Sequence, residues 1–330
     1  MKGGTRVVVG TLSTIAIVSA LAIVFRSERD KTEASPGSAP SRGTLATAEA
    51  PSREDAGSLG PGPPPPREES SDASAGEPTD AAEWDERYRT EDLFSFAQSA
   101  AVAAMNGDGR AGWLLSLVLV DCKVLLDTAD RRDPALRGTL AEDRLDDSKI
   151  QRCEGFRAAH PLDGLPDEAK RPSYWRELAI AAGDGRAVAY RAVVERATRV
   201  NNDMDSATKA SYRSLILDDL RVAVATKDPE AIATLANVFF QPKVSRDPRR
   251  GVAWLIAACE LGYDCSMTNP ALRSACARSG TCGGTTLTDG FRQSVTPAEF
   301  AKMYAAAQDI AYNVRQGNWD ALQQYLAMDL

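Results

Sequence analysis

The stretches KDPEAIATLANVFF, residues 227–240, and RDPRRGVAWLIAACELGYD, residues 246–264, decide how this chain folds. Each contains Asp-Pro near its start, which places a capping side chain directly before a proline at the first helical position. The apolar side chains then recur at helical spacing: Ile232, Leu235, Ala236 and Phe239, then Trp254, Ala257, Ala258 and Leu261. The two stretches therefore predict two amphipathic helices with matching apolar stripes.

A short junction of one design recurs along the chain, as GDGRA at 107–111, GDGRA at 183–187 and KDPEA at 227–231. In this design a small residue ends one helix, an aspartate caps the next, and an alanine permits close packing at the corner. The recurrence predicts a stack of helical hairpins, an architecture that mostly serves to bind other proteins.

Helical spacing continues over the rest of the chain from residue 80 onward, and no stretch alternates apolar and polar residues as a strand would. Thr90 is placed to cap a helix that ends at Gly107. The run Thr296-Pro297-Ala298-Glu299 forms a capping box for a helix that ends at Gly317. The sequence thus predicts an all-α domain over 81–330, organised as an array of αα-hairpins.

The two quoted stretches resemble the Sel1-like repeats, which are related to the tetratricopeptide repeats. The residues that carry the resemblance are Asp228, Pro229, Ala231, Leu235 and Ala236 in the first helix, and Ala253, Trp254 and Gly262 in the second. The likeness is clearest over 221–265 and partial over 93–126 and 173–197. It implies a helical solenoid and a role as a scaffold or adaptor in multiprotein assemblies, often in bacterial envelopes.

The N-terminal segment, residues 1–26, is apolar and carries no charge over the nineteen residues from Val7 to Phe25. That is about the length needed to cross a hydrocarbon layer of ~30 Å as a helix. The sequence therefore predicts one transmembrane anchor that ends at a polar run starting with Arg26. A cleavable signal peptide ending near Ala22 is the alternative, because Ala20-Leu21-Ala22 has the small-x-small form of a cleavage site.

Residues 27–80 contain no aromatic side chain and have 5 basic and 11 acidic residues, a net charge of −6. A segment of this composition cannot bury enough apolar surface to offset its ordering entropy, so we expect a disordered spacer. It accounts for most of the net charge of −7 of the whole chain. Residues 81–330 are therefore nearly balanced in charge, which argues against a nucleic-acid-binding surface.

All six cysteines lie in residues 81–330, and their even number predicts three disulfides. We expect the pairs Cys122–Cys153, Cys259–Cys265 and Cys276–Cys282, with exchange among the last four as the alternative. A zinc site is the rival explanation, but the chain has no CxxC pair and a single histidine. Disulfides place this part in an oxidising compartment, and we expect the bacterial periplasm, beyond an inner-membrane anchor or as a soluble protein after cleavage.

Few residue patterns point to chemistry. His160 is the only imidazole and falls in an expected loop, so we assign it no catalytic role. The adjacent acidic pairs Asp146-Asp147 and Asp218-Asp219 are typical of a solvated helix face. The run CGGTT at 282–286 lacks the Lys-Ser/Thr of a phosphate-binding loop. No catalytic, cofactor-binding or metal-binding residue is predicted.

The five tryptophans mostly fall on apolar helix faces, and core packing is the default interpretation of Trp113, Trp175 and Trp254. We expect Trp84 and Trp319 to be the more exposed ones.

The favoured hypothesis is a non-catalytic, membrane-tethered periplasmic scaffold or adaptor that binds another envelope protein. A module that binds peptidoglycan, another glycan or a small ligand is the alternative. A hydrolase that depends on carboxylates alone is less favoured, because it requires two acidic groups converging from separate helices.

Overall fold

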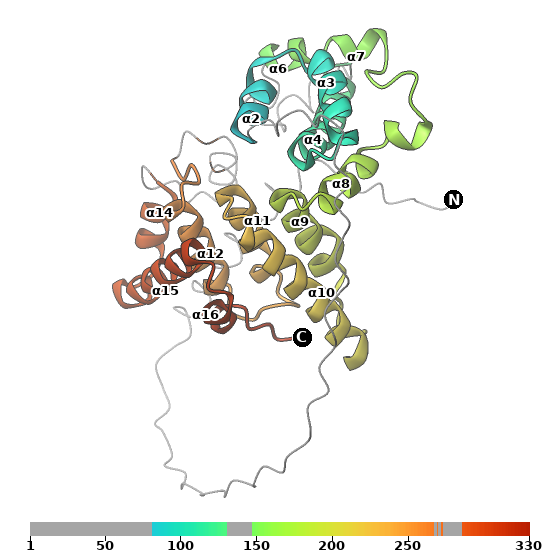
Figure 1. Ribbon diagram of the computed structural model, residues 1–330. Coiled ribbons are helices and arrows are strands. Elements are labelled where there is room, and N and C mark those ends of the chain that lie inside the picture. Colours follow the sequence, from blue (N-terminus) through green and yellow to red (C-terminus); the bar gives the residue numbers. More distant parts are fainter. Residues whose placement is uncertain (1–80, 131–146, 267–268, 270–271, 273–285) are drawn as a thin grey trace, which may run out of the picture.

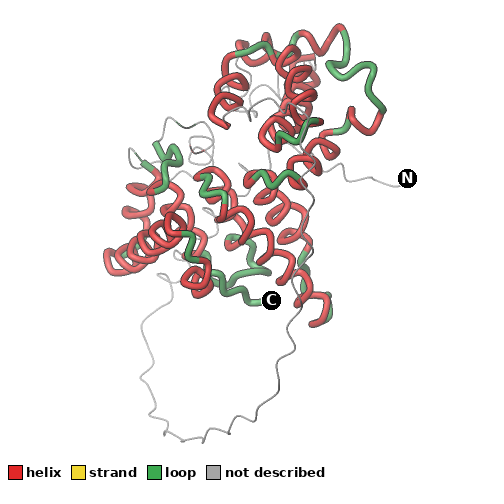
Figure 2. The backbone as a smooth tube through the Cα atoms, viewed as in Figure 1, coloured by secondary structure: helices red, strands yellow, loops and turns green. Residues whose placement is uncertain are grey.

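The computed structural model describes residues 81–130, 147–266, 269, 272 and 286–330 (Figure 1). These residues form thirteen α-helices and several short 3₁₀ or π segments, with no strand among them (Figure 2). The predicted all-α class is confirmed for the described part. The expected anchor Val7–Phe25 and spacer 27–80 lie outside it. None of the described helices is both long and apolar enough to span a membrane.

The N-terminal part of the array is built around one long helix, α4 (Gly109–Asp130), which packs against α3 (Leu93–Met105) and α8 (Pro172–Ala181). Helix α2 (Ala81–Thr90) lies across α3 and α4. The connection from α4 to α8 contains the short helices α6 (Asp147–Arg152) and α7 (Gly155–Ala158) and the 3₁₀ turn η2 (Asp167–Lys170).

The C-terminal part contains the two helices predicted from the quoted stretches, α11 (Pro229–Phe239) and α12 (Arg249–Glu260), and they pack along each other. The segments before them are α9 (Gly185–Tyr190), the π-helical η3 (Arg191–Arg196), η4 (Ala197–Arg199) and α10 (Ser206–Ala225). Those after them are α14 (Leu287–Ser294), α15 (Pro297–Gln316), α16 (Trp319–Leu322) and η5 (Gln323–Tyr325). Helix α11 also packs against α9, and α12 packs against α15.

Two hydrophobic clusters form the core. One lies among α2, α3, α4 and α8, and the other joins the helices from α9 to α16. Ile180 of α8 packs against both clusters, and α9 contributes Ala187 to the first and Val188 to the second, so α8 and α9 link the two parts seen in Figure 1. In the C-terminal cluster Phe239 of α11 stacks on Trp254 of α12, with ring centroids 6.1 Å apart. The predicted apolar stripes of these two helices therefore meet inside the core.

Helix ends follow the local signals in most places. The Thr296 hydroxyl accepts a hydrogen bond from the Glu299 N–H, and the Glu299 carboxylate accepts from the Thr296 N–H, so the expected capping box of α15 is present. The expectation for Thr90 is wrong. Thr90 is the last residue of α2, and Asp92 caps α3 by accepting from the Ser95 N–H at 2.9 Å.

Four corners of the array share one anatomy. A residue with a left-handed backbone ends a helix at Gly107, Gly183, Lys227 and Gly317. The next residue then caps the following helix: Asp108, Asp184, Asp228 and Asn318. At the glycine corners the N–H of the capping residue also bonds back to a carbonyl five residues earlier, as in a Schellman motif. The fourth corner was not recognised in the sequence, because asparagine takes the place of aspartate there.

The third corner differs because its left-handed residue is Lys227, with φ of 56°. At this corner the side chain of Thr226 links the capping residue to the carbonyl five residues earlier. The Asp228 N–H donates to the hydroxyl of Thr226 at 3.3 Å, and that hydroxyl donates to the Ala223 carbonyl at 2.6 Å. The Lys227 ammonium donates to the Arg315 carbonyl at the end of α15, at 2.7 Å. The third corner is therefore tied to the region of the fourth.

Candidate functional site

The first three corners stack closely at one edge of the array. A Cβ added to Gly109 would lie 3.0 Å from the Cβ of Ala182 and 3.1 Å from that of Asp184, both in the second corner. A Cβ added to Gly185 would lie 2.9 Å from the Cγ2 of Thr226, next to the third corner. The second glycine of each GDGRA junction is thus needed because the next corner occupies the space of a side chain.

Each capping aspartate divides its two oxygens between two tasks. One oxygen caps its own helix, accepting from the N–H of Ala111 for Asp108 and of Ala187 for Asp184, both at 2.9 Å. The other oxygen faces an element that precedes it in the chain. Asp108 accepts from the indole of Trp84 at 2.6 Å, and Asp184 lies 3.2 Å from Nε of Arg110.

Asp228 completes this series by binding the arginines of both earlier corners. Its Oδ2 accepts from Nη2 of Arg110 at 2.5 Å and from Nε of Arg186 at 2.8 Å, while its Oδ1 caps α11. Each GDGRA arginine therefore reaches forward to the capping aspartate of the next corner. We call this series, from Trp84 through Arg110 and Arg186 to Asp228, the corner ladder.

Two further acids, Asp85 and Glu230, form ion pairs with the arginines of the ladder. Asp85 of α2 forms a bidentate pair with Arg186, at 2.8 and 3.1 Å, and Glu230 forms an ion pair with the same guanidinium. Arg110 lies 3.5 Å from Asp85, although neither this contact nor the one to Asp184 has hydrogen-bond geometry. Four carboxylates thus surround two guanidinium groups.

The pKa values of the two buried aspartates of the ladder, Asp184 and Asp228, are shifted in opposite directions. Burial raises the pKa of Asp184, and the attraction of Arg110 does not fully offset it. Burial acts in the same direction on Asp228, but Arg186 and Arg110 together outweigh it, so the pKa of Asp228 is lowered. Relative to a free aspartate, the folded protein therefore favours the charged form of Asp228 and disfavours the charged form of Asp184.

Converging carboxylates are what a carboxylate-dependent hydrolase requires, so the ladder is the place to look for one. Asp184 and Asp228, however, each have one oxygen on a helix N-terminus and the other on arginine. Both carboxylates are therefore engaged in helix capping and in ion pairs. Within the described residues no group of His, Cys, Asp and Glu has the arrangement of a metal site. The geometry favours a structural role for these acids.

A second buried ion cluster lies between η3 and α10. Asp219 is 1% exposed and accepts from Arg191 at 2.5 Å, while Arg196 pairs with it at 2.9 Å. The expected solvated face is therefore wrong for Asp219. Asp219 is buried because the π-helical turn brings Arg191 and Arg196, five positions apart, to the same side of the chain, where both can pair with it. An α-helix would not do this. Asp146 lies outside the described residues, as does the side chain of Asp147.

Two of the three predicted disulfides are present. Cys122 of α4 is joined to Cys153, after α6, with Cα atoms 5.3 Å apart, and Cys259 to Cys265 with Cα atoms 5.6 Å apart. Cys276 and Cys282 lie outside the described residues, together with most of the glycine-rich run 282–286.

The remaining candidate residues have packing roles. The Nδ1 atom of His160 accepts a hydrogen bond from the Leu162 N–H at 3.2 Å, which fixes a local turn. Trp84 is 2% exposed, so its expected exposure is wrong, since Asp108 supplies the partner that its indole N–H needs inside the core. Trp319 is half-buried. Trp113, Trp175 and Trp254 are buried as expected.

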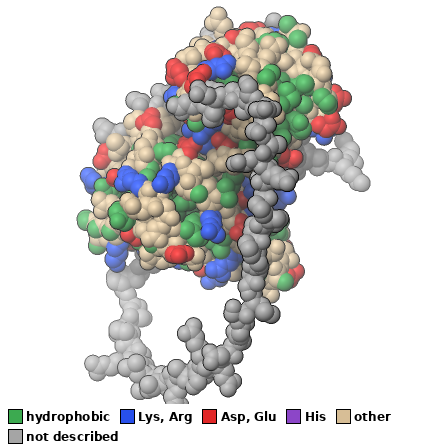
Figure 3. Space-filling view, in the orientation of Figure 1, with side chains coloured by type: hydrophobic (Ala, Val, Ile, Leu, Met, Phe, Trp, Pro, Cys, Tyr) green, Lys and Arg blue, Asp and Glu red, His purple; other side chains and the backbone are tan. Residues whose placement is uncertain are grey.

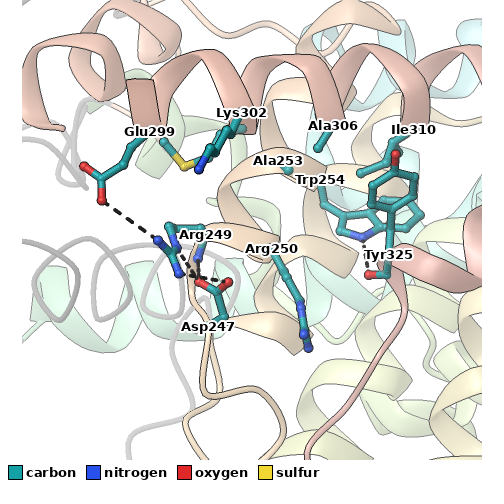
Figure 4. Close-up of a pocket in the computed structure, with 11 residues that line it drawn as sticks. Asp247, Arg249, Arg250, Ala253, Trp254, Glu299, Lys302, Ala306, Ile310 and Tyr325 are labelled. Atoms are coloured by element: carbon teal, nitrogen blue, oxygen red, sulfur yellow. Dashed lines mark hydrogen bonds and ion pairs between the residues drawn. The ribbon is translucent and has the colours of Figure 1, made fainter. Parts of the chain in front are cut away.

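A pocket of about 450 Å³ opens between α12, α15 and the C-terminal residues (Figure 4). We call it the α12–α15 pocket. Its charged lining comes from Asp247, Arg249, Arg250, Glu299 and Lys302, and its other lining from Ala253, Trp254, Met303, Ala306, Ile310 and Tyr325. In Figure 4, Glu299 and Lys302 project from α15 on the side where Arg249 lies, and Tyr325 lies beside Trp254. No sequence motif predicts this pocket, because its walls come from helices that are separated in the chain.

The outer surface carries exposed apolar side chains in two pairs that share a helix face. Val102 and Met105 lie three positions apart on α3, and Leu215 and Val222 lie seven apart on α10. Among the residues that the structure describes, Tyr312 of α15 is the most exposed large hydrophobic residue, at 60%. In Figure 3 charged side chains of both signs are present on the visible face, with a group of Lys and Arg on the lower body near α14 and α15.

No family model matches this chain. No curated protein and no solved structure matches it either. The resemblance to the Sel1-like repeats therefore stays a prediction that rests on the residues quoted for it.

Proposed function

We propose that this protein is a non-catalytic scaffold or adaptor that binds another protein of the bacterial envelope. In this proposal residues 7–25 anchor it in the inner membrane, and residues 81–330 act in the periplasm. The observation that carries the proposal is the corner ladder, in which buried side chains hold successive hairpins in one register. A fixed register is what a helical-repeat surface needs in order to present binding residues from several hairpins at once.

Three further observations support the proposal. The exposed apolar pairs on α3 and α10 offer surface of the kind that protein partners cover. The two disulfides suit an oxidising compartment. Asp184 and Asp228 are engaged by arginines and by helix N-termini, which favours a structural role over a catalytic one for these two acids. The glycan alternative gains little support from Trp84, Trp113, Trp175 and Trp254, because all four side chains are buried.

Site-specific photocrosslinking in intact cells tests this function. A benzophenone amino acid would replace Val102, Leu215 and Tyr312 one at a time in the full-length chain. We expect at least one position to form a discrete crosslink to one envelope protein that saturates as expression rises. The matched control replaces the buried Phe96, which should give no crosslink to another protein. The absence of any saturable crosslink from all three exposed positions would contradict the proposal.

A further inference from the structure

We propose that the α12–α15 pocket binds an extended segment of the protein partner in which a carboxylate side chain stands close to an apolar one. The inference rests on the proposed adaptor function and names the site and the chemistry of the contact. It follows from the charge of the lining, the small apolar residues in it, and the way in which neighbouring residues already bind a segment of this chain.

The acids of the pocket are already occupied. Arg249 donates from Nε to Asp247 at 2.7 Å, and its Nη1 lies 3.9 Å from Glu299. Although burial alone would raise the pKa of Asp247, the hydrogen bonds from Arg249 lower it, so this carboxylate stays charged and paired. One arginine therefore balances part of the charge of both acids. Arg250 and Lys302 remain as cations on the lining.

Those two cations give the pocket its preference for an anion. Lys302 is exposed on α15 and forms no ion pair within 4 Å with any residue that the structure describes. Three cations and two anions line the pocket, a net charge of +1. A carboxylate entering beside Lys302 meets an ammonium group that has no described acidic partner, whereas a basic group would meet like charge.

Part of the pocket lining is apolar, and two of its residues are alanines, whose small side chains leave free volume. Ala253 of α12 and Ala306 of α15 line the pocket together with Met303 and Ile310, which are buried. Two alanines on facing helices leave room that larger side chains would fill. A volume of about 450 Å³ is within the range of sites that enclose a ligand of several functional groups. An apolar side chain fits on this apolar part of the lining beside the charged rim.

Residues next to the pocket already bind a non-helical segment of this chain, residues 326–330 together with the Tyr325 carbonyl. The Tyr325 carbonyl accepts from the indole of Trp254 at 3.3 Å, and the Ala327 carbonyl accepts from Arg250. Asp329 accepts from the Arg246 N–H at 2.7 Å and donates its own N–H to the Val244 carbonyl at 2.8 Å. Side-chain donors to carbonyls and a donor to a carboxylate thus hold a non-helical segment, and Arg250 and Trp254 also line the pocket.

Peptide selection on the full-length protein tests the inference. Random twelve-residue peptides displayed on phage would be panned against the detergent-solubilised protein, and the affinities of selected peptides measured by fluorescence polarisation. We expect enrichment of Asp or Glu within two positions of a large apolar residue. Binding should weaken at least tenfold in Lys302→Glu, which reverses the rim charge, and in Ala306→Trp, which fills the free volume.

Lys209→Glu is the matched control, because it makes the same charge change on α10 outside the pocket lining, and binding should be unchanged. Peptides without an acidic preference, or binding that both pocket variants retain, would overturn the inference. So would stabilisation by peptidoglycan fragments with no peptide selected. If any of these outcomes is found while the photocrosslinks at Val102, Leu215 or Tyr312 persist, the adaptor function stands and only the pocket assignment is wrong.

Discussion

Arg110 and Asp228 are 118 positions apart in the chain, yet Nη2 of the arginine donates to Oδ2 of the aspartate at 2.5 Å. This bond joins the first corner of the array to the third. Nε of the same arginine also lies 3.2 Å from Oδ2 of Asp184, which belongs to the second corner. One guanidinium therefore touches the capping residues of two later corners, and the corners cannot slide past one another without breaking buried ion pairs.

Replacing Asp228 by asparagine tests the strength of these pairs without removing the helix cap. Asparagine caps helices about as well as aspartate, so the substitution removes the charge and leaves the cap. We expect Asp228→Asn to lower the free energy of unfolding by about 3 kcal/mol, because Arg110 and Arg186 each lose a buried carboxylate. Urea unfolding followed by circular dichroism measures the change.

The control for that prediction is Asp205→Asn. Asp205 also caps a helix, α10, by accepting from the Thr208 N–H, and it forms no ion pair with a described residue. Its substitution should leave the urea midpoint unchanged. Equal losses at Asp205 and Asp228 would mean that the cap, and not the ion pairs, carries the effect.

The stabilisation from Asp228 should depend on pH. Its pKa is lowered in the folded protein, so its contribution is complete above the unfolded pKa and is lost as the pH falls through the folded pKa. The difference in unfolding free energy between wild type and Asp228→Asn should therefore be constant above about pH 5 and shrink below about pH 4. A difference that grows on acidification would contradict the assignment.

Asp184→Asn should behave differently although it makes the same substitution in the same ladder. Burial raises the pKa of Asp184, so its charge is disfavoured on balance in the folded protein. We expect a loss of less than about 1 kcal/mol at neutral pH. Relative to this variant, the wild type should gain stability as the pH falls through the raised pKa of Asp184, the opposite sign to Asp228. Unfolding titrations at a series of pH values compare the two variants.

The close approach of the second and third corners predicts a clash. In Gly185→Ala the new methyl would lie against the side chain of Thr226, and we expect a loss of about 2 kcal/mol or more in unfolding free energy. In a Thr226→Gly background the obstructing atoms are gone, so adding Gly185→Ala should cost almost nothing further. Thermal unfolding of the four proteins provides the comparison. An equal cost in both backgrounds would place the strain elsewhere.

The disulfides predict both a stability change and a redox state. Replacing Cys122 and Cys153 by alanine should cost about 3–4 kcal/mol, and replacing Cys259 and Cys265 about 2 kcal/mol, because the longer loop restricts the unfolded chain more. In cells, a thiol-reactive polymer should modify these four cysteines only after reduction. Modification before reduction would contradict the periplasmic assignment.

The corners show how much of the fold could be predicted from the sequence. Left-handed glycines and capping aspartates are local signals, so the ends at Gly107 and Gly183 and the caps at Asp108 and Asp184 were recognisable. The pairing of Arg110 with Asp228 was not, because it depends on which corners become neighbours in space. The available clue was the arginine that stands two positions after the capping aspartate in both GDGRA copies.

The candidate site was less accessible to sequence analysis than the fold. The α12–α15 pocket combines the start of α12, one face of α15 and Tyr325, and no motif links these segments. The buried pairing of Asp219 depends on a π-helical turn, which has no periodic signature in the sequence. Local helix chemistry could thus be predicted, whereas contacts between distant segments needed the structure.

A double-mutant cycle between Arg110 and Asp228 tests the central claim most directly, namely that the corner ladder joins distant hairpins into one body. The unfolding free energies of wild type, Arg110→Leu, Asp228→Asn and the double variant would be measured in urea at pH 7. We predict a coupling energy of about 1.5 kcal/mol or more, so that the double variant is clearly more stable than the two separate losses imply. Additive losses, with a coupling below about 0.3 kcal/mol, would contradict the claim.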